Sequence, residues 1–256
     1  MDGLRVLGLH GKGTNSEIMK AQVGPLCRAA EIEGHVQFES GPVPSVPYHN
    51  IERFFPGQDY RAWYEAPTSE KLREAQDYLS ALLQGRPLGS PDEVPKPQVS
   101  DMRKVTLSRS AAFDLYNELS RDLPRAFDGV ICFSQGCALA AGLLLQTSIE
   151  HPAEEAPIKF AIFICGSRPF SPVTTQRYNT RELKGTDAPI RITIPTLHII
   201  GKQDGARQEG HLLASLCAPG TAEVLEFDGG HAPPRKSKDI QEVARAIKRL
   251  VCKAQA

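Results

Sequence analysis

The sequence lacks an excess of charge of either sign, because 30 Lys and Arg residues balance 30 Asp and Glu residues. The two signs are interspersed, so no basic surface for nucleic acid or for an anionic membrane is indicated. No apolar run approaches the roughly 18 residues of a membrane-spanning helix, and no signal peptide is recognisable. We therefore expect a cytoplasmic protein with neither nucleic-acid nor membrane partners.

Cysteine is sparse and has no metal-binding or redox pattern. The six cysteines stand mostly among apolar neighbours and without Cys-x-x-Cys spacing, which favours reduced, buried thiols. They are Cys27, Cys132, Cys137, Cys165, Cys217 and Cys252. The sequence therefore predicts neither a disulfide nor a zinc site.

Nucleotide-binding motifs are also missing. The early glycine-rich stretch around Gly11-Lys12-Gly13 does not complete a phosphate-binding loop, and it lacks the third glycine of a dinucleotide site. We expect no cofactor.

What is present suits one α/β domain over residues 1–256. The length of 256 residues and the hydrophobic content of 41% permit a large single core. Short β-rich runs alternate with helical patterns, which predicts a mostly parallel central sheet with helices on both faces. The predicted strands are 4–9, 35–40, 129–133, 158–165, 193–200 and 222–227, and the predicted helices are 16–33, 68–84, 105–119, 135–147 and 238–253.

The segment Gly129–Ala141 has the pattern of a buried strand, a tight turn and a helix of small residues. Ser134 stands at the turn, where a nucleophile elbow Gly-x-Ser-x-Gly would place its serine. Cys132 replaces the first glycine, but it is small enough for a point where strand and helix nearly touch. The motif alone does not separate a catalytic serine from a plain strand-to-helix turn.

Two further polar residues follow later predicted strands. Asp204 comes after 193–200, and His231 comes after 222–227. Because the carboxyl ends of parallel strands converge on one crevice, Ser134, Asp204 and His231 are expected on the same side. The chain order serine, aspartate, histidine is that of the α/β-hydrolases, so we predict that fold and a catalytic triad. His231 would take the proton of Ser134, and Asp204 would hold the imidazole.

Other acids and histidines are given structural interpretations. Asp228 competes with Asp204 as the acid, but it lies only three residues before His231, where it suits the turn. We interpret His10 as structural rather than as a second base. The remaining histidines do not cluster, which predicts no metal site.

The loop from His10 to Asn15 follows the first predicted strand. Hydrolases of this architecture direct the backbone N–H groups of such a loop at the oxyanion of the reaction, and glycine permits the close approach. We therefore predict that the N–H groups of Lys12 and Gln135 form the oxyanion hole. The Lys12 side chain itself is expected in solvent.

The irregular segment 41–67 is unusually aromatic. Phe54, Phe55, Trp63 and Tyr64 are candidates for the wall of an apolar substrate pocket, although they could instead attach the loop to the core. Arg168, after a later strand, is interpreted first as a plain surface arginine, and contact with an anionic substrate group is the alternative.

Two other connections are candidates for covers of the site. Gly85–Pro97 contains four prolines and is either a mobile surface loop or a flap. Residues 171–190 are polar and without pattern, which predicts a small loop-built cap near the rim.

Five motifs together resemble the fungal serine hydrolase family of α/β-hydrolases, also called the ovarian-cancer-associated gene 2 family. They are Leu9–Asn15, Phe133–Gly136, Gly201–Asp204, Gly229–His231 and Phe54–Tyr64, and they span nearly the whole chain. The first two are fairly specific to that family. Lys12 replaces an aromatic residue of the family pattern and Cys132 replaces the elbow glycine, and neither departure touches the predicted triad.

Members of this family include carboxylesterases and the stand-alone thioesterases of fungal polyketide pathways, and the latter resemble the enzyme type that releases the lovastatin chain. The resemblance therefore implies one of these two activities. It favours a hydrolase that frees an acyl chain from the thioester of an acyl carrier protein through an acyl-Ser134 intermediate. A carboxylesterase for small or medium-chain oxygen esters remains open, because both reactions share one tetrahedral intermediate. A non-catalytic α/β binding module is the alternative from another class.

Overall fold

A six-stranded parallel sheet forms the centre of the computed structural model, which describes residues 3–85, 126–179 and 191–255. The predicted helix 105–119, most of the predicted flap and residues 180–190 lie outside these ranges. Along the sheet the strands are β2 (Val36–Glu39), β1 (Val6–Leu9), β5 (Gly129–Phe133), β6 (Phe160–Ile164), β7 (Thr196–Gly201) and β8 (Ala222–Phe227). Every neighbouring pair is parallel, which confirms the predicted sheet.

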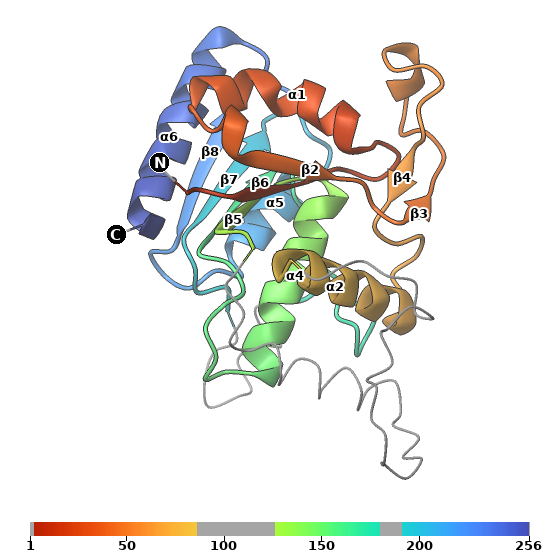
Figure 1. The fold of residues 1–256 in the computed structure, drawn as a ribbon, viewed down its shortest axis with the longest axis vertical. Coiled ribbons are helices and arrows are strands. Elements are labelled where there is room, and N and C mark those ends of the chain that lie inside the picture. The colour runs from red at the N-terminus through yellow and green to blue at the C-terminus, as the bar shows by residue number, and fades with distance from the viewer. Residues whose placement is uncertain (1–2, 86–125, 180–190, 256) are drawn as a thin grey trace, which may run out of the picture.

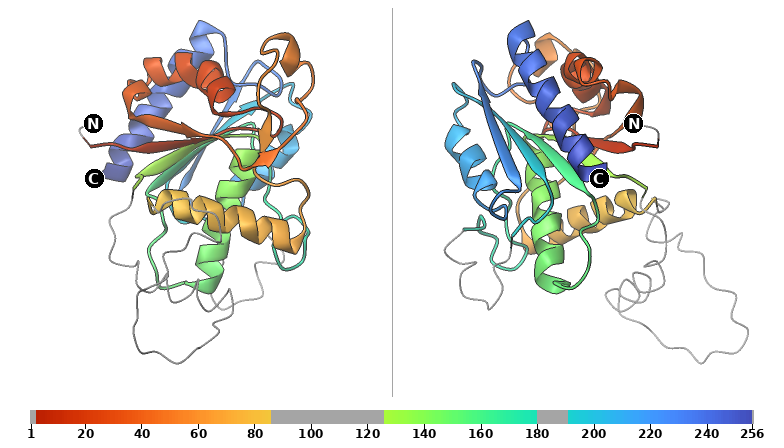
Figure 2. Two further views of the ribbon diagram at one scale, coloured as in Figure 1. Left: turned by 45° about the vertical axis from the view of Figure 1, so that its right-hand side comes forward. Right: turned by 90° about the vertical axis from the view of Figure 1, so that its left-hand side faces the viewer.

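Helices cover both faces of this sheet (Figures 1 and 2). One face carries α1 (Ser16–Ala29) and α6 (Ser237–Gln255), and the other carries α2 (Ser69–Leu83), α4 (Gln135–Glu150) and α5 (Arg207–Ala214). Each face of the sheet has its own hydrophobic core, and alternate residues of a strand point into one or the other. Val130 and Cys132 of β5 pack toward α4, whereas Ile131 and Phe133 pack toward α1 and α6. The central strands are buried on both faces, which explains their continuous apolar sequences.

Local signals set the helix boundaries. Asn15 begins α1 by accepting a 2.8 Å hydrogen bond from the N–H of Ile18, and Thr68 caps α2 in the same manner. The predicted helix 16–33 ends early, at Ala29, because Glu31 adopts a left-handed backbone and a short 3₁₀ turn, Glu33–His35, follows. The eight-residue α5 was not predicted from the sequence, and it begins directly after the Asp204 turn.

The irregular segment 41–67 contains little regular structure, as expected. Two short strands, β3 (Val43–Pro44) and β4 (Arg61–Ala62), form a separate antiparallel pair, with a 3₁₀ turn at Ile51–Arg53 between them. This segment projects beyond the carboxyl edge of β1 and β2 (Figure 1). Thr14 forms an isolated bridge with Arg61, which ties the segment to the loop after β1.

The first half of the predicted cap packs against helices. The Tyr178 hydroxyl donates a 3.1 Å hydrogen bond to Gln146 of α4, and the Tyr178 N–H bonds to the Pro169 carbonyl. None of residues 167–179 lines the cavity at Ser134, so this described part does not form the predicted cover.

The cysteines of the described chain are all free, and only Cys252 is exposed. Among the described residues no helix combines the length and apolarity needed to cross a membrane.

Candidate active site

The three residues of the predicted triad lie in one line of hydrogen bonds. His231 Nε2 is 2.9 Å from Ser134 Oγ, and His231 Nδ1 is 2.8 Å from Asp204 Oδ2. Ser134 follows β5, Asp204 follows β7 and His231 follows β8, so the carboxyl ends of the parallel strands bring the three together. Both distances are those of good hydrogen bonds.

The backbone at Ser134 has the geometry of a nucleophile elbow. Its φ of +50° lies in the left-handed region, which is unfavourable for a residue with a Cβ. Serine commonly caps a helix with its hydroxyl, but this hydroxyl makes no cap bond and faces His231 instead. The strained turn therefore frees the oxygen for chemistry.

Two glycines make the elbow possible. A Cβ on Gly136 would lie 2.4 Å from the Leu9 carbonyl oxygen, so only glycine lets α4 pass so close to the end of β1. A Cβ on Gly11 would lie 2.8 Å from the Phe133 ring and 3.2 Å from Ser134 Cβ. Glycine at these positions therefore brings the early loop against the elbow.

Asp204 is held more firmly than its competitor. Its side chain is 3% exposed, and its second oxygen, Oδ1, accepts a 2.8 Å bond from the Ala206 N–H. Asp228 is exposed and pairs with Lys236 and Gln203, and the hydrogen bond from Lys236 holds the pKa of its carboxyl below the ordinary value. Asp204 is thus the acid that binds the imidazole of His231, and Asp228 is a residue of the exposed turn before it.

Aromatic rings flank the imidazole of His231. The Phe133 ring centroid lies 5.2 Å away and the Tyr48 centroid 5.9 Å away. The imidazole side chain keeps 22% exposure. The imidazole is therefore flanked by two tilted rings and remains partly exposed at the cavity.

The two predicted oxyanion donors lie at the ends of β1 and β5. Gln135 begins α4, where the first backbone N–H groups have no partner within the helix. Among the described residues, neither the Lys12 N–H nor the Gln135 N–H donates a hydrogen bond. The Lys12 side chain is exposed and donates to the Glu65 carbonyl at 3.1 Å.

His10 is a structural residue, as interpreted from the sequence. It is fully buried, and its Nε2 accepts a 2.8 Å bond from the Gly41 N–H, so the proton resides on Nδ1 and is donated to the Gly11 carbonyl. Burial lowers its pKa to about 4. A neutral imidazole with both nitrogens engaged is not available as a second base.

Trp63 and Tyr64 correct the prediction of a substrate wall. Trp63 is 1% exposed, its Nε1 donates to the His10 carbonyl at 2.8 Å, and its ring lies 5.0 Å from the His10 ring. Tyr64 belongs to the same hydrophobic core, where burial raises its pKa to about 12. Neither lines the cavity at Ser134, because both side chains face inward to α2 and α4.

The side chain of Gln135 has a role that sequence reasoning missed. Its Oε1 accepts from the Trp63 N–H at 3.0 Å, and its Nε2 donates to the Tyr64 carbonyl at 2.8 Å. The residue after Ser134 thus clamps the aromatic segment to the elbow. No spacing rule finds such a contact, since its partners are 71 and 72 positions away.

A cavity of about 150 Å³ opens onto Ser134 and His231. Phe54 lies in its wall and is 73% exposed, as a substrate-contacting residue would be, whereas Phe55 is half-buried and does not line it. The other lining residues are Lys12, Thr14, Gln22, Tyr48, His49, Asn50, Ile51, Phe133, Ala232 and Arg235. Tyr48 belongs to the aromatic segment that was predicted to supply such a wall, whereas Ile51 of the same segment and Arg235, four residues after His231, were not predicted.

The structure does not support the alternative that Arg168 contacts the substrate. Its guanidinium makes a bidentate ion pair with Glu209 of α5, at 3.0 and 2.8 Å, and it does not line the cavity. Its hydrogen bonds hold the pKa of Glu209 below the ordinary value. The residue connects the turn after β6 to α5 and is not placed to meet a substrate anion.

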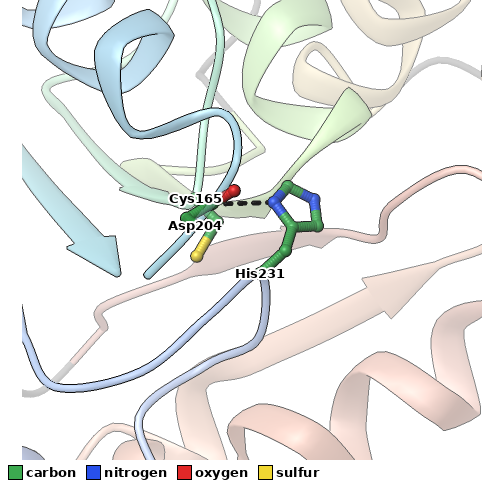
Figure 3. A group of neighbouring side chains, drawn as sticks. All are labelled: Cys165, Asp204 and His231. Atoms are coloured by element: carbon green, nitrogen blue, oxygen red, sulfur yellow. Dashed lines mark hydrogen bonds and ion pairs between the residues drawn. The ribbon is translucent and has the colours of Figure 1, made fainter. Parts of the chain in front are cut away.

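Figure 3 shows Cys165 beside Asp204 and His231, and one ligand atom of each lies within 4.8 Å of the others. A zinc ion bound at about 2 Å to Nδ1 and to a carboxylate oxygen in tetrahedral geometry would spread these atoms to about 3.3 Å. They are 2.8 Å apart and directly hydrogen-bonded. The geometry fits an acid–histidine pair rather than a metal site.

Comparison with known proteins identifies the family of this chain. The model of the family described as serine hydrolase (FSH1) matches residues 1–243. The chain belongs to this family. It is 29% identical to the esterase FPY3 of Fusarium mangiferae, with 98% of both chains covered, and 28% identical to the hydrolase phiM of a fungal species, with 98% and 96% covered.

The fold comparison agrees with the family. The crystal structure of Zea mays acyl-protein thioesterase 2 matches with a TM-score of 0.51 at 15% identity, over 98% of this chain and 96% of that one. The fold is that of the α/β-hydrolases, as predicted. The chain is a serine hydrolase with esterase relatives, and the non-catalytic alternative is not retained.

Proposed function

We propose that this serine hydrolase frees an acyl chain, of the polyketide type, from the thioester of an acyl carrier protein through an acyl-Ser134 intermediate. The observation that carries the proposal is the continuous line of hydrogen bonds from Ser134 Oγ through His231 to Asp204. A serine hydroxyl is a poor nucleophile, and an adjacent base oriented by a carboxylate is the arrangement that activates it.

In the proposed first step, His231 Nε2 accepts the proton of Ser134 as Oγ attacks the carbonyl carbon. The N–H groups of Lys12 and Gln135 stabilise the negative charge that develops on the carbonyl oxygen. The tetrahedral intermediate expels the thiolate, which leaves with the proton from His231. Asp204 remains ionised and stabilises the imidazolium in between.

In the second step, water replaces the thiol. His231 takes a proton from the water as its oxygen attacks the acyl-Ser134 carbonyl, and it returns that proton to Ser134 Oγ when the carboxylic acid departs. The same two steps hydrolyse an oxygen ester, so the triad does not distinguish the substrates.

The cavity walls support an apolar acyl chain joined to an anionic arm. Tyr48, Ile51 and Phe54 supply an apolar side. Arg235 lies on the wall beside His231, is exposed and makes no ion pair with another described residue. No carboxylate lines the described cavity, so the phosphate of a phosphopantetheine arm would meet a cation without a competing anion.

A carboxylesterase for small or medium-chain oxygen esters is the second candidate. The relative with 29% identity carries the name esterase, and the open cavity of about 150 Å³ accommodates a short acyl group. In that case the apolar wall would bind the acyl chain, and Arg235 would have no role in the reaction.

Hydrolysis of a matched medium-chain acyl thioester and oxygen ester by the wild type and by Ser134→Ala tests the choice. A strong preference for the thioester, abolished in Ser134→Ala, supports chain release and justifies carrier-bound substrates. A preference for the oxygen ester supports the carboxylesterase.

A second pair of substrates tests the anionic arm. Acyl-phosphopantetheine and acyl-pantetheine differ only by the phosphate, so Arg235→Gln should raise KM for the first about three- to tenfold and leave the second unchanged. Arg245→Gln removes the same charge from the exposed side of α6 and serves as the matched control. Equal KM values for the two thioesters in the wild type would contradict the phosphate contact.

A further inference from the structure

Four consecutive strands of the sheet each deliver one side chain to the active-site edge. Ser134 follows β5, Cys165 follows β6, Asp204 follows β7 and His231 follows β8. The proposed reaction uses three of these residues and leaves Cys165 without a role. Because β6 lies between β5 and β7, its end points into the space between the nucleophile and the acid.

Cys165 is held in an unfavourable backbone conformation. Its φ is +48°, in the left-handed region that glycine adopts at no cost, yet this position carries a side chain. Its N–H donates a 2.9 Å bond to the Ile199 carbonyl of β7, so the turn is fixed against the neighbouring strand. Strain at a non-glycine residue beside an active site is an observation that calls for a function of the side chain.

The thiol contacts the segment that carries the catalytic histidine. Cys165 Sγ lies 3.7 Å from the Gly230 carbonyl and 3.6 Å from the Ala232 carbonyl, the residues on either side of His231. In Figure 3 the sulfur lies beside both Asp204 and His231. One S–H group is thus surrounded by acceptors on the loops that present the acid and the base.

The thiol keeps its proton at neutral pH. Burial, and after it the neighbouring Asp204 carboxylate, raises the pKa of Cys165 to about 12. A protonated sulfur is a hydrogen-bond donor and neither a nucleophile nor a good metal ligand.

We propose that Cys165 is a positioning residue whose S–H group holds the Gly230–Ala232 segment, and with it the His231 ring, in line between Asp204 and Ser134. This inference rests on the proposed role of His231 as the general base. Cys165 touches no substrate and acts only through His231. Without it, the segment loses its anchor to β6 and the imidazole samples orientations that do not reach both partners.

The test compares Cys165→Ala, Cys165→Ser and a matched control on the best oxygen or thioester substrate. Cys165→Ala removes the donor and keeps Cβ, so kcat should fall about three- to tenfold with KM unchanged. Cys165→Ser restores a donor and should return kcat to within about twofold of the wild type. Cys217→Ala removes another buried thiol, near Thr196 and away from the triad, and should lower Tm without lowering kcat.

Two readouts separate positioning from a merely structural role. The midpoint of the pH profile of kcat/KM reports the base in the free enzyme, and it should shift in Cys165→Ala but not in Cys217→Ala. If kcat of Cys165→Ala equals that of the wild type, the proposal is overturned. A Cys165→Ser variant whose kcat falls about tenfold or more below the wild type would also overturn it, and this comparison with the wild type does not need a folded Cys165→Ala variant.

The outcomes distinguish this inference from the proposed function. Ser134→Ala activity equal to the wild type would overturn the proposed mechanism and the positioning role with it. Activity that depends on Ser134 but is insensitive to Cys165 would overturn the positioning role alone.

Discussion

The two sides of the active site are built differently. The side that carries the triad consists of strand ends, with Asp204 3% exposed and every triad contact between 2.8 and 2.9 Å. The opposite side is the loop between β3 and β4, where Tyr48 and Phe54 are exposed and no strand supports them. The proposed chemistry therefore lies on the strand ends, while the contacts proposed for substrate lie on a connection that can vary without disturbing the core.

This difference predicts large losses of activity from changes on the sheet side. Ser134→Ala removes the nucleophile and His231→Ala removes the base, so each should lower kcat by a factor of about 10⁴ or more, with Tm little changed. Steady-state hydrolysis and fluorophosphonate labelling provide the measurement. Labelling of the Ser134→Ala protein at the wild-type rate would contradict the assignment of the nucleophile.

The choice of acid is the next contrast. Asp204→Asn should lower kcat by about 10² to 10⁴ with KM largely unchanged, because the buried amide no longer stabilises the imidazolium. Asp228→Asn is the matched control on the His231 loop, and it should change kcat by less than about twofold because it loses only exposed contacts with Lys236 and Gln203. A larger loss in Asp228→Asn would reverse the assignment.

Substitutions of two aromatic residues in the segment 41–67 should have different effects, one on the stability of the protein and the other on its substrate specificity. Trp63→Ala creates a cavity in the core and should lower the free energy of unfolding by about 3–5 kcal/mol, without selectivity for acyl length. Phe54→Ala should leave Tm unchanged and raise KM for a medium-chain substrate about three- to tenfold more than for an acetyl substrate. Denaturant titration and KM values for the two chain lengths provide the measurement. Loss of chain-length selectivity in Trp63→Ala alone would contradict the core assignment.

The last contrast concerns the pH dependence of stability. Burial lowers the pKa of His198 to about 3 and that of His10 to about 4, whereas the unfolded chain protonates near 6.5. The unfolded state therefore binds more protons below pH 6.5, and the free energy of unfolding should fall progressively as the pH drops toward 4.

His198→Leu should flatten this dependence, measured as Tm between pH 7.5 and 4.5. His198 Nδ1 has no hydrogen-bond partner among the residues that the structure describes, and the Thr196 hydroxyl keeps the Thr221 carbonyl as its acceptor, so the substitution leaves little unsatisfied. His151→Gln alters an exposed histidine and serves as the control. If Tm depends on pH equally in the wild type and in His198→Leu, buried His198 does not cause the loss of stability at low pH.

Much of the fold was predictable because its signals are local. Continuous apolar runs such as 129–133 mark buried parallel strands, and the amphipathic spacing of α6 marks a surface helix. Boundaries were less predictable. The strand predicted over 158–165 ends at Ile164, since Cys165 turns into the left-handed region, and no local propensity indicates that conformation for cysteine.

The aromatic segment shows where local reasoning ends. Phe54 and Trp63 are both large and apolar and lie nine positions apart, yet one is 73% exposed at the cavity and the other is 1% exposed in the core. Which side each ring faces depends on the Thr14–Arg61 bridge and on the Gln135 clamp, and both join residues far apart in the chain. Arg168 is a similar case, since Glu209 is 41 positions away.

The sequence by itself determined the parallel sheet, the elbow motif and the order of Ser134, Asp204 and His231, because periodicity, turn residues and strand ends are properties of short segments. Only the tertiary structure decided which side chains reach the cavity, that Gln135 binds the backbone of Trp63, and that Cys165 contacts the histidine loop. Each of these contacts joins residues that are far apart in the chain. They come close only when the sheet places its strands side by side.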